Sequence, residues 1–184
     1  MVTIGIFVFM TALVMARYNS FYSGTLFSNL AYDIALTIKE AQTYGISVKV
    51  TDPSLSSTFK AAYGVHFDKT ANTTFTLFAD TDSSPASHAN VYNIGTDAVE
   101  SQYYLRNGGT ISGLCVGTNG SSCDSTVVNL LDIVFRRPQP AALISVNGSY
   151  SATYNYAEIT IRSGDGSATK KIKVTGVGLI SVSD

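Results

Sequence analysis

The hydrophobic and polar positions divide the chain into two parts. Residues 1–16 read MVTIGIFVFMTALVMA, an uncharged, proline-free run that ends at Arg17. The chain then becomes more polar, but up to residue 44 an apolar residue recurs every three or four positions, which predicts one apolar face of a helix. The recurring residues are Leu26, Leu30, Ile34, Ile38 and Ala41. Gly45 is a typical residue just beyond a helix C-terminus, so we expect residues 1–44 to form one helix.

From residue 46 onward the apolar positions alternate with a period of two, which predicts strands with one buried face. The predicted strands cover residues 46–50, 63–67, 74–77, 157–162 and 171–174. Residues 163–169 should link the last two as a hairpin, and the mostly apolar residues 127–135 should form a central strand. Residues 51–57, 79–90 and 106–125 are polar and predict long loops.

The predicted fold class is therefore α+β: a long N-terminal hydrophobic helix packed on an antiparallel β-sheet head of residues 45–184. Residues 1–16 are expected to form a membrane or filament core, while residues 17–44 pack on the head. The side chains expected to carry membrane insertion or assembly are Ile4, Ile6, Phe7, Val8, Phe9, Leu13 and Val14. The apolar face defined above is expected to carry the helix-to-sheet packing.

Composition favours a β-rich surface protein over a cytosolic enzyme. Of the 184 residues, 45% are hydrophobic and only 14% are charged, below the roughly 25% of typical proteins. The net charge of −1 gives no general attraction to nucleic acid or to an anionic membrane.

The opening run could be a signal peptide, a membrane helix or a buried helix. A signal peptide would need a basic start and a cleavage site, and no basic residue precedes Arg17. A membrane span needs about 20 apolar residues, whereas sixteen cover only about 24 Å. The run is therefore slightly short for a full span.

Three stretches of the sequence resemble type IV pilin-like proteins, in particular the minor pseudopilins of type II secretion and their pilus counterparts (the GspH/FimT-like group). MVTIGIFVFMTALVM is similar to the hydrophobic N-terminal helix of that superfamily. LAYDIALTIKEAQTYGIS, at residues 30–47, is similar to the end of its long helix. LDIVFRRP, at residues 131–138, and the predicted hairpin of residues 157–181 are similar to its C-terminal strands.

This resemblance implies processing that the chain itself does not display. Pilin-like proteins carry a basic leader that is cleaved before a methylated Phe, and a Glu follows shortly after. MVTIGIF is most similar to the part after that Glu, so we expect about six residues of the mature helix to precede Met1, which would approach a full membrane span. The resemblance also implies a single-pass inner-membrane location before assembly and an extracellular or periplasmic filament afterwards.

The function implied is that of a structural subunit of a type IV pilus or a type II secretion pseudopilus. Its partners would be copies of itself or other pilin-like subunits, the inner membrane, a prepilin peptidase and an assembly machinery. Alternatives are a minor tip pseudopilin, a DNA-uptake receptor and a membrane-anchored binding domain that never polymerises. Nucleic acid is not an expected partner. A basic patch could form from Arg136, Arg137, Lys170, Lys171 and Lys173, but outward-facing lysines on a solvated hairpin are the better explanation.

Cys115 and Cys123 are the two cysteines of the chain. Their spacing does not match a redox CxxC motif or a zinc ligand set. With the membrane anchor placing them outside the cytoplasm, we expect a disulfide worth about 2.5 kcal/mol on the chain-entropy model. Two free thiols are the alternative.

No catalytic or cofactor motif stands out, and we expect neither enzyme activity nor a cofactor. His66 and His88 have no partner close in sequence and are interpreted as surface histidines. Asp80 and Asp82 form a weak calcium candidate, for which a solvated turn is the favoured explanation. No other metal site is predicted.

Overall fold

The computed structural model describes residues 2–47, 61–81, 89–118, 123 and 128–184, with the side chains of residues 16–26 left aside. One helix, α1 (Val2–Ile46), precedes a series of strands. The strands are β1 (Ala62–Asp68), β2 (Thr74–Asp80), β3 (Ala98–Tyr104), β4 (Thr110–Gly117), β5 (Leu130–Phe135), β6 (Ala142–Val146), β7 (Ser149–Tyr150), β8 (Tyr156–Arg162), β9 (Thr169–Thr175) and β10 (Ile180–Ser183).

The strands form two antiparallel sheets. The larger sheet has the order β3-β2-β1-β5-β6-β7, and the smaller has the order β10-β9-β8-β4. Within the larger sheet β1 is central, because it pairs with β2 on one side and with β5 on the other. The predicted hairpin of β8 and β9 and the predicted apolar strand β5 are both present.

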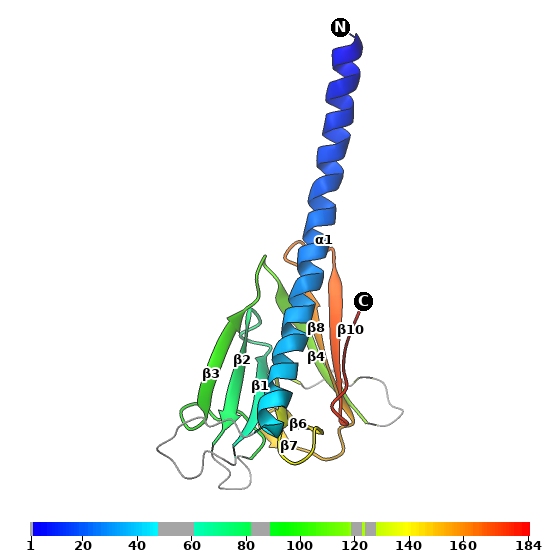
Figure 1. Cartoon of the computed structure of the whole chain (residues 1–184). Helices are drawn as coiled ribbons and strands as arrows, with labels where there is room; N and C mark the ends of the chain where they lie inside the picture. The colour runs from blue at the N-terminus through cyan, green and yellow to red at the C-terminus, as the bar shows by residue number, and fades with distance from the viewer. Residues whose placement is uncertain (1, 48–60, 82–88, 119–122, 124–127) are drawn as a thin grey trace.

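Both sheets share one core with the second half of α1 (Figure 1). Ile34 and Ile38 of the helix are fully buried, together with Val65 of β1, Ile133 of β5 and Ile172 of β9. The helix therefore lies where the two inner sheet faces meet, and each sheet covers part of its apolar face.

The predicted fold class, a pilin-like α+β arrangement with a long hydrophobic helix on an antiparallel sheet, is wrong. Strands make up the larger part of the regular structure in the described residues, and they form two sheets. The helix is also not hydrophobic along its length, because Arg17 ends the apolar run and polar residues follow. Alternation with a period of two identifies strands, but it does not identify which strands pair, so one sheet could not be distinguished from two.

The predicted location is also wrong. Within the described residues, no helix is both long enough and apolar enough to span a bilayer, which does not support a single-pass inner-membrane anchor. The physical reason is that charged and polar residues begin at Arg17, so the apolar run is shorter than the roughly 20 residues that a membrane span needs.

Three local predictions also differ from the structure. Gly45 lies inside α1, not beyond its end, and a Cβ there would lie 2.3 Å from the carbonyl oxygen of Phe135, so glycine allows the helix to approach β5 closely. Strand β4 occupies part of the loop predicted at residues 106–125. Ile46 ends the helix instead of starting a strand, Ser47 lies in a turn, and residues 48–50 of that predicted strand lie outside the described residues.

Candidate assembly surface

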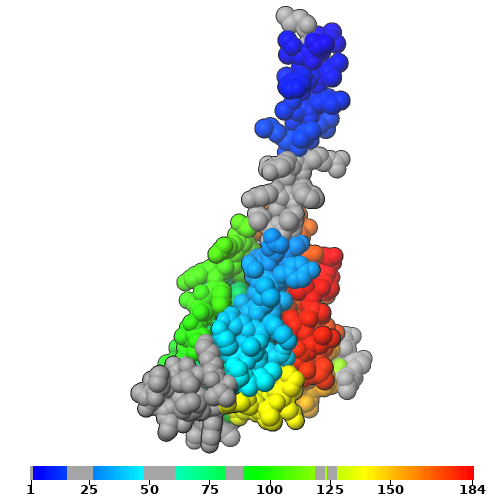
Figure 2. Space-filling view, viewed as in Figure 1, coloured from blue at the N-terminus to red at the C-terminus, as the bar shows by residue number. Residues whose placement is uncertain are grey.

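The first part of α1 extends away from both sheets (Figure 1). In the space-filling view, residues 2–15 stand clear of the head along the helix axis (Figure 2). At about 1.5 Å per residue, this projecting segment is about 21 Å long. We call residues 2–15 the apolar stem.

The apolar stem exposes large hydrophobic side chains on every side of the helix. The side chains predicted to carry assembly are 51–74% exposed. They are Ile4, Ile6, Phe7, Val8, Phe9, Leu13 and Val14. Thr11, a polar residue within the stem, donates from Oγ1 to the carbonyl oxygen of Phe7 at 2.7 Å, so its hydroxyl is satisfied inside the helix. The stem therefore presents a continuous apolar surface, which is rare on an isolated protein and is typical of an interaction site.

The second part of α1 is instead packed against the head. Leu30, Ile34, Ile38 and Ala41 are buried in the main core, whereas the side chain of Leu26 lies outside the described residues. These residues hold the helix through apolar contact with both sheets.

A buried polar contact fixes the end of the helix. The Gln42 side chain is 3% exposed, and its Nε2 donates to the carbonyl oxygens of Pro140 and Gly178 at 2.9 and 3.0 Å. Its Oε1 accepts from Lys39 Nζ. Gln42 thus ties α1 to the turn before β10 and to the segment before β6. Sequence analysis missed this residue, because its partners lie about a hundred or more positions away along the chain.

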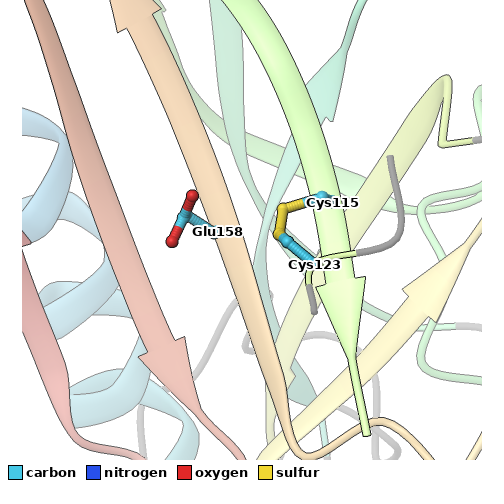
Figure 3. A group of neighbouring side chains, drawn as sticks. All are labelled: Cys115, Cys123 and Glu158. Carbon is cyan, nitrogen blue, oxygen red and sulfur yellow. A yellow bond between two sulfur atoms is a disulfide. The ribbon is translucent and has the colours of Figure 1, made fainter. Parts of the chain in front are cut away.

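The two cysteines form a disulfide, with Cα atoms 5.6 Å apart. Cys115 lies on β4 directly opposite Glu158 of β8 in the strand register. Figure 3 shows Glu158 beside the two sulfurs, and one ligand atom from each of the three residues lies within 4.8 Å of the others. Glu158 also forms an ion pair with Lys171, whose Nζ lies 3.2 Å from Glu158 Oε1.

His66 is not a surface histidine. Its Nδ1 lies 2.6 Å from Oδ1 of Asp132, and the Asp132 side chain is almost fully buried. Burial raises the pKa of Asp132, although the hydrogen bonds from His66 and from the backbone of Tyr92 act in the opposite direction. The strand register places His66 opposite Asp132, a pairing that could not be read from residues far apart in the sequence.

Asp80, one of the two residues of the weak calcium candidate, is paired with an arginine. Asp80 Oδ2 accepts from the Asn90 backbone N–H at 2.8 Å and from Arg136 Nη2 at 3.2 Å. A guanidinium at this position disfavours a second cation. Asp82 lies outside the described residues, as does His88.

The basic side chains of the β8–β9 hairpin have nearby partners. Lys170 pairs with Asp184, Lys171 pairs with Glu158, and Lys173 lies 4.0 Å over the ring centre of Tyr156. The carboxylates of Asp184 and Glu158 offset the positive charges of Lys170 and Lys171 locally.

A groove runs between α1 and the edge strand β3. Its volume is about 650 Å³, with Leu36 and Phe75 among its apolar residues and Asp33, Glu40 and Arg106 at polar positions. Tyr44, at the end of the helix, donates its phenol to Glu40 Oε1 at 2.5 Å, and this hydrogen bond raises the pKa of Tyr44 to about 12.

Comparison with protein families, characterised proteins and solved structures finds no match for this chain. The resemblance to pilin-like proteins is therefore a prediction that rests on the three sequence stretches quoted above. The feature of the described structure that points most directly to a function is the apolar stem.

Proposed function

We propose that this chain is a structural subunit that assembles with copies of itself, or with related subunits, through the apolar stem. The observation that carries the proposal is the exposure of large side chains such as Phe7 and Phe9, at 74% and 67%, along the whole stem. Burying one such side chain contributes about 1.5–3 kcal/mol. A stem with this many exposed apolar side chains therefore has a strong drive to associate.

The position of the stem favours a polymer over a closed ring. The stem lies at one end of the molecule and the sheets lie at the other (Figure 1). If stems pack side by side with a stagger, each contact joins two different surfaces of neighbouring copies. Contacts of this kind build a helical fibre when the rotation that relates one copy to the next does not close into a ring. The heads would then form the outside of the fibre.

The sequence resemblance suggests which polymer this is. A type IV pilus and a type II secretion pseudopilus are both built from subunits with a hydrophobic N-terminal helix. The proposed role is structural.

Electron microscopy of the purified full-length chain tests this proposal. The chain is dispersed in mild detergent, the detergent is removed, and pelleted material is quantified and imaged. We expect regular filaments for the wild type. Phe7→Asp should reduce pelleted filaments by at least about tenfold, because an unpaired charge buried between stems costs well over the 1.4 kcal/mol that corresponds to tenfold.

The matched control is Val177→Asp, which places the same charge at an exposed apolar residue of the head. This variant should assemble like the wild type, and both variants should keep the wild-type melting temperature of the head. Filaments from Phe7→Asp at the wild-type yield would contradict the proposal, as would a wild type that stays monomeric after detergent removal.

A further inference from the structure

The outer face of the smaller sheet brings together two sulfurs and a carboxylate. Cys115 of β4 faces Glu158 of β8, and Cys123 returns to the same place through the disulfide. The three ligand atoms lie within 4.8 Å of one another (Figure 3). Cys115 is 6% exposed and the Glu158 side chain is 17% exposed, so the group is largely shielded from water.

We propose that, in the reduced protein, Cys115, Cys123 and Glu158 bind Zn²⁺. Thiolates and carboxylates are both zinc ligands, and two thiolates around a tetrahedral zinc ion stand about 3.8 Å apart. For these three residues to bind one zinc ion, the two sulfurs must move apart to that distance after the disulfide is reduced. Three protein ligands leave a fourth position for water or another small ligand.

Zinc binding requires that the disulfide is first reduced. A dithiol reductant transfers two electrons and two protons to the disulfide, which gives two thiols and an oxidised reductant. Zn²⁺ then displaces the two thiol protons and binds the resulting thiolates. In the oxidised protein the sulfurs are bonded to each other, so the disulfide and the metal exclude one another.

Two lysines lie near this ligand set and act on it in opposite ways. Two thiolates and a carboxylate around Zn²⁺ leave a net negative charge. Lys171 lies 3.2 Å from Glu158, and Lys173 is opposite Glu158 in the strand register. Both ammonium groups can offset that charge once the metal is bound. Lys171 also competes for the carboxylate, so its removal should strengthen metal binding.

Co²⁺ is the probe for the test, because it occupies zinc sites and absorbs light. The full-length chain, dispersed in mild detergent, is reduced with a phosphine, freed of reductant without oxygen, and titrated with Co²⁺. We expect binding of one Co²⁺ per chain, with a thiolate-to-cobalt charge-transfer band and the visible band of a tetrahedral site. Added Zn²⁺ should remove both bands, and the oxidised protein should show neither.

Variants separate the three ligands. Cys115→Ser and Cys123→Ser should each lose most of the charge-transfer intensity. Glu158→Gln should weaken Co²⁺ binding at least about tenfold, since the loss of even a supporting residue costs 10–100-fold. Asp33→Asn, which removes an exposed carboxylate on α1, is the matched control and should bind like the wild type.

Thermal unfolding shows whether each variant is folded and gives a second measure of metal binding. Zn²⁺ should raise the melting temperature of the reduced wild type and of Asp33→Asn, and should raise that of Glu158→Gln less. Two results would overturn the proposal: a reduced wild type without a charge-transfer band at saturating Co²⁺, or a Glu158→Gln variant that binds Co²⁺ as tightly as Asp33→Asn.

Discussion

The two parts of helix α1 are both rich in apolar residues, but they stand in opposite surroundings. In the apolar stem, Ile4 is 65% exposed, whereas Ile38 in the second part is fully buried. The difference lies in the pattern: the second part confines its apolar residues to one face, and the two sheets cover that face, while the stem is apolar on every side. A helix that is apolar all round needs a partner on all sides. One head cannot supply that, and other copies can.

The largest expected effect is the difference in unfolding free energy between two isoleucine variants, one in each part of α1. Ile38→Ala should lower the free energy of unfolding by about 2–5 kcal/mol, because it leaves a cavity where α1 meets the sheets. Ile4→Ala should change it by less than about 0.5 kcal/mol, because Ile4 is 65% exposed. Urea denaturation of the detergent-dispersed monomer measures both values. Equal losses from the two variants would contradict the division of α1 into an exposed and a packed part.

A smaller effect is expected from the polar contact at the end of the packed part. Gln42→Ala should cost about 1–3 kcal/mol of unfolding free energy, because the buried Gln42 amide is lost and the carbonyl oxygens of Pro140 and Gly178 lose their donor. Thr43→Ala is the neighbouring control, since Thr43 is exposed and its hydroxyl donates to the Lys39 carbonyl oxygen of the same helix. The same denaturation series measures both variants. A Gln42→Ala variant as stable as Thr43→Ala would show that this contact does not hold the helix on the head.

The smallest effect concerns Tyr44, whose phenol is expected to titrate late. The hydrogen bond to Glu40 raises the pKa of Tyr44 from 10.0 to about 12. The folded pKa lies above the unfolded one, so the stability from this contact is fully present below pH 10 and is lost as the pH rises through about 12. Ultraviolet titration of the phenolate, with Tyr44→Phe subtracted, reads the pKa directly. Glu40→Gln should lower it towards 10, and an unchanged value in that variant would exclude Glu40 as its cause.

The sequence predicts local features of this molecule better than distant ones. A mostly apolar run identified the strand at β5, and alternation identified the β8–β9 hairpin, because both signals lie in neighbouring residues. It missed β4, whose glycines at positions 113 and 117 weaken the strand pattern. It also could not assign strands to two sheets, since pairing depends on residues far apart along the chain.

The candidate sites follow the same rule. The exposed stem was visible in the sequence as a run without charge or proline. The contacts between His66 and Asp132 and between Cys115 and Glu158 were not, because each joins residues on separate strands and depends on the register. Their side chains become neighbours only when the strands pair.

Photocrosslinking from Phe9 tests the central claim, that the stem is buried against other copies, most directly. A photoreactive benzoylphenylalanine replaces Phe9 in the full-length chain, with the same replacement at Val177 of the head as the control, and crosslinked peptides are identified by mass spectrometry after assembly. The account predicts that the probe at Phe9 joins two copies through residues of α1, and that the probe at Val177 rarely reaches the helix of another copy. A probe at Phe9 that leaves only monomers, or that joins only strands of a neighbouring head, would contradict it.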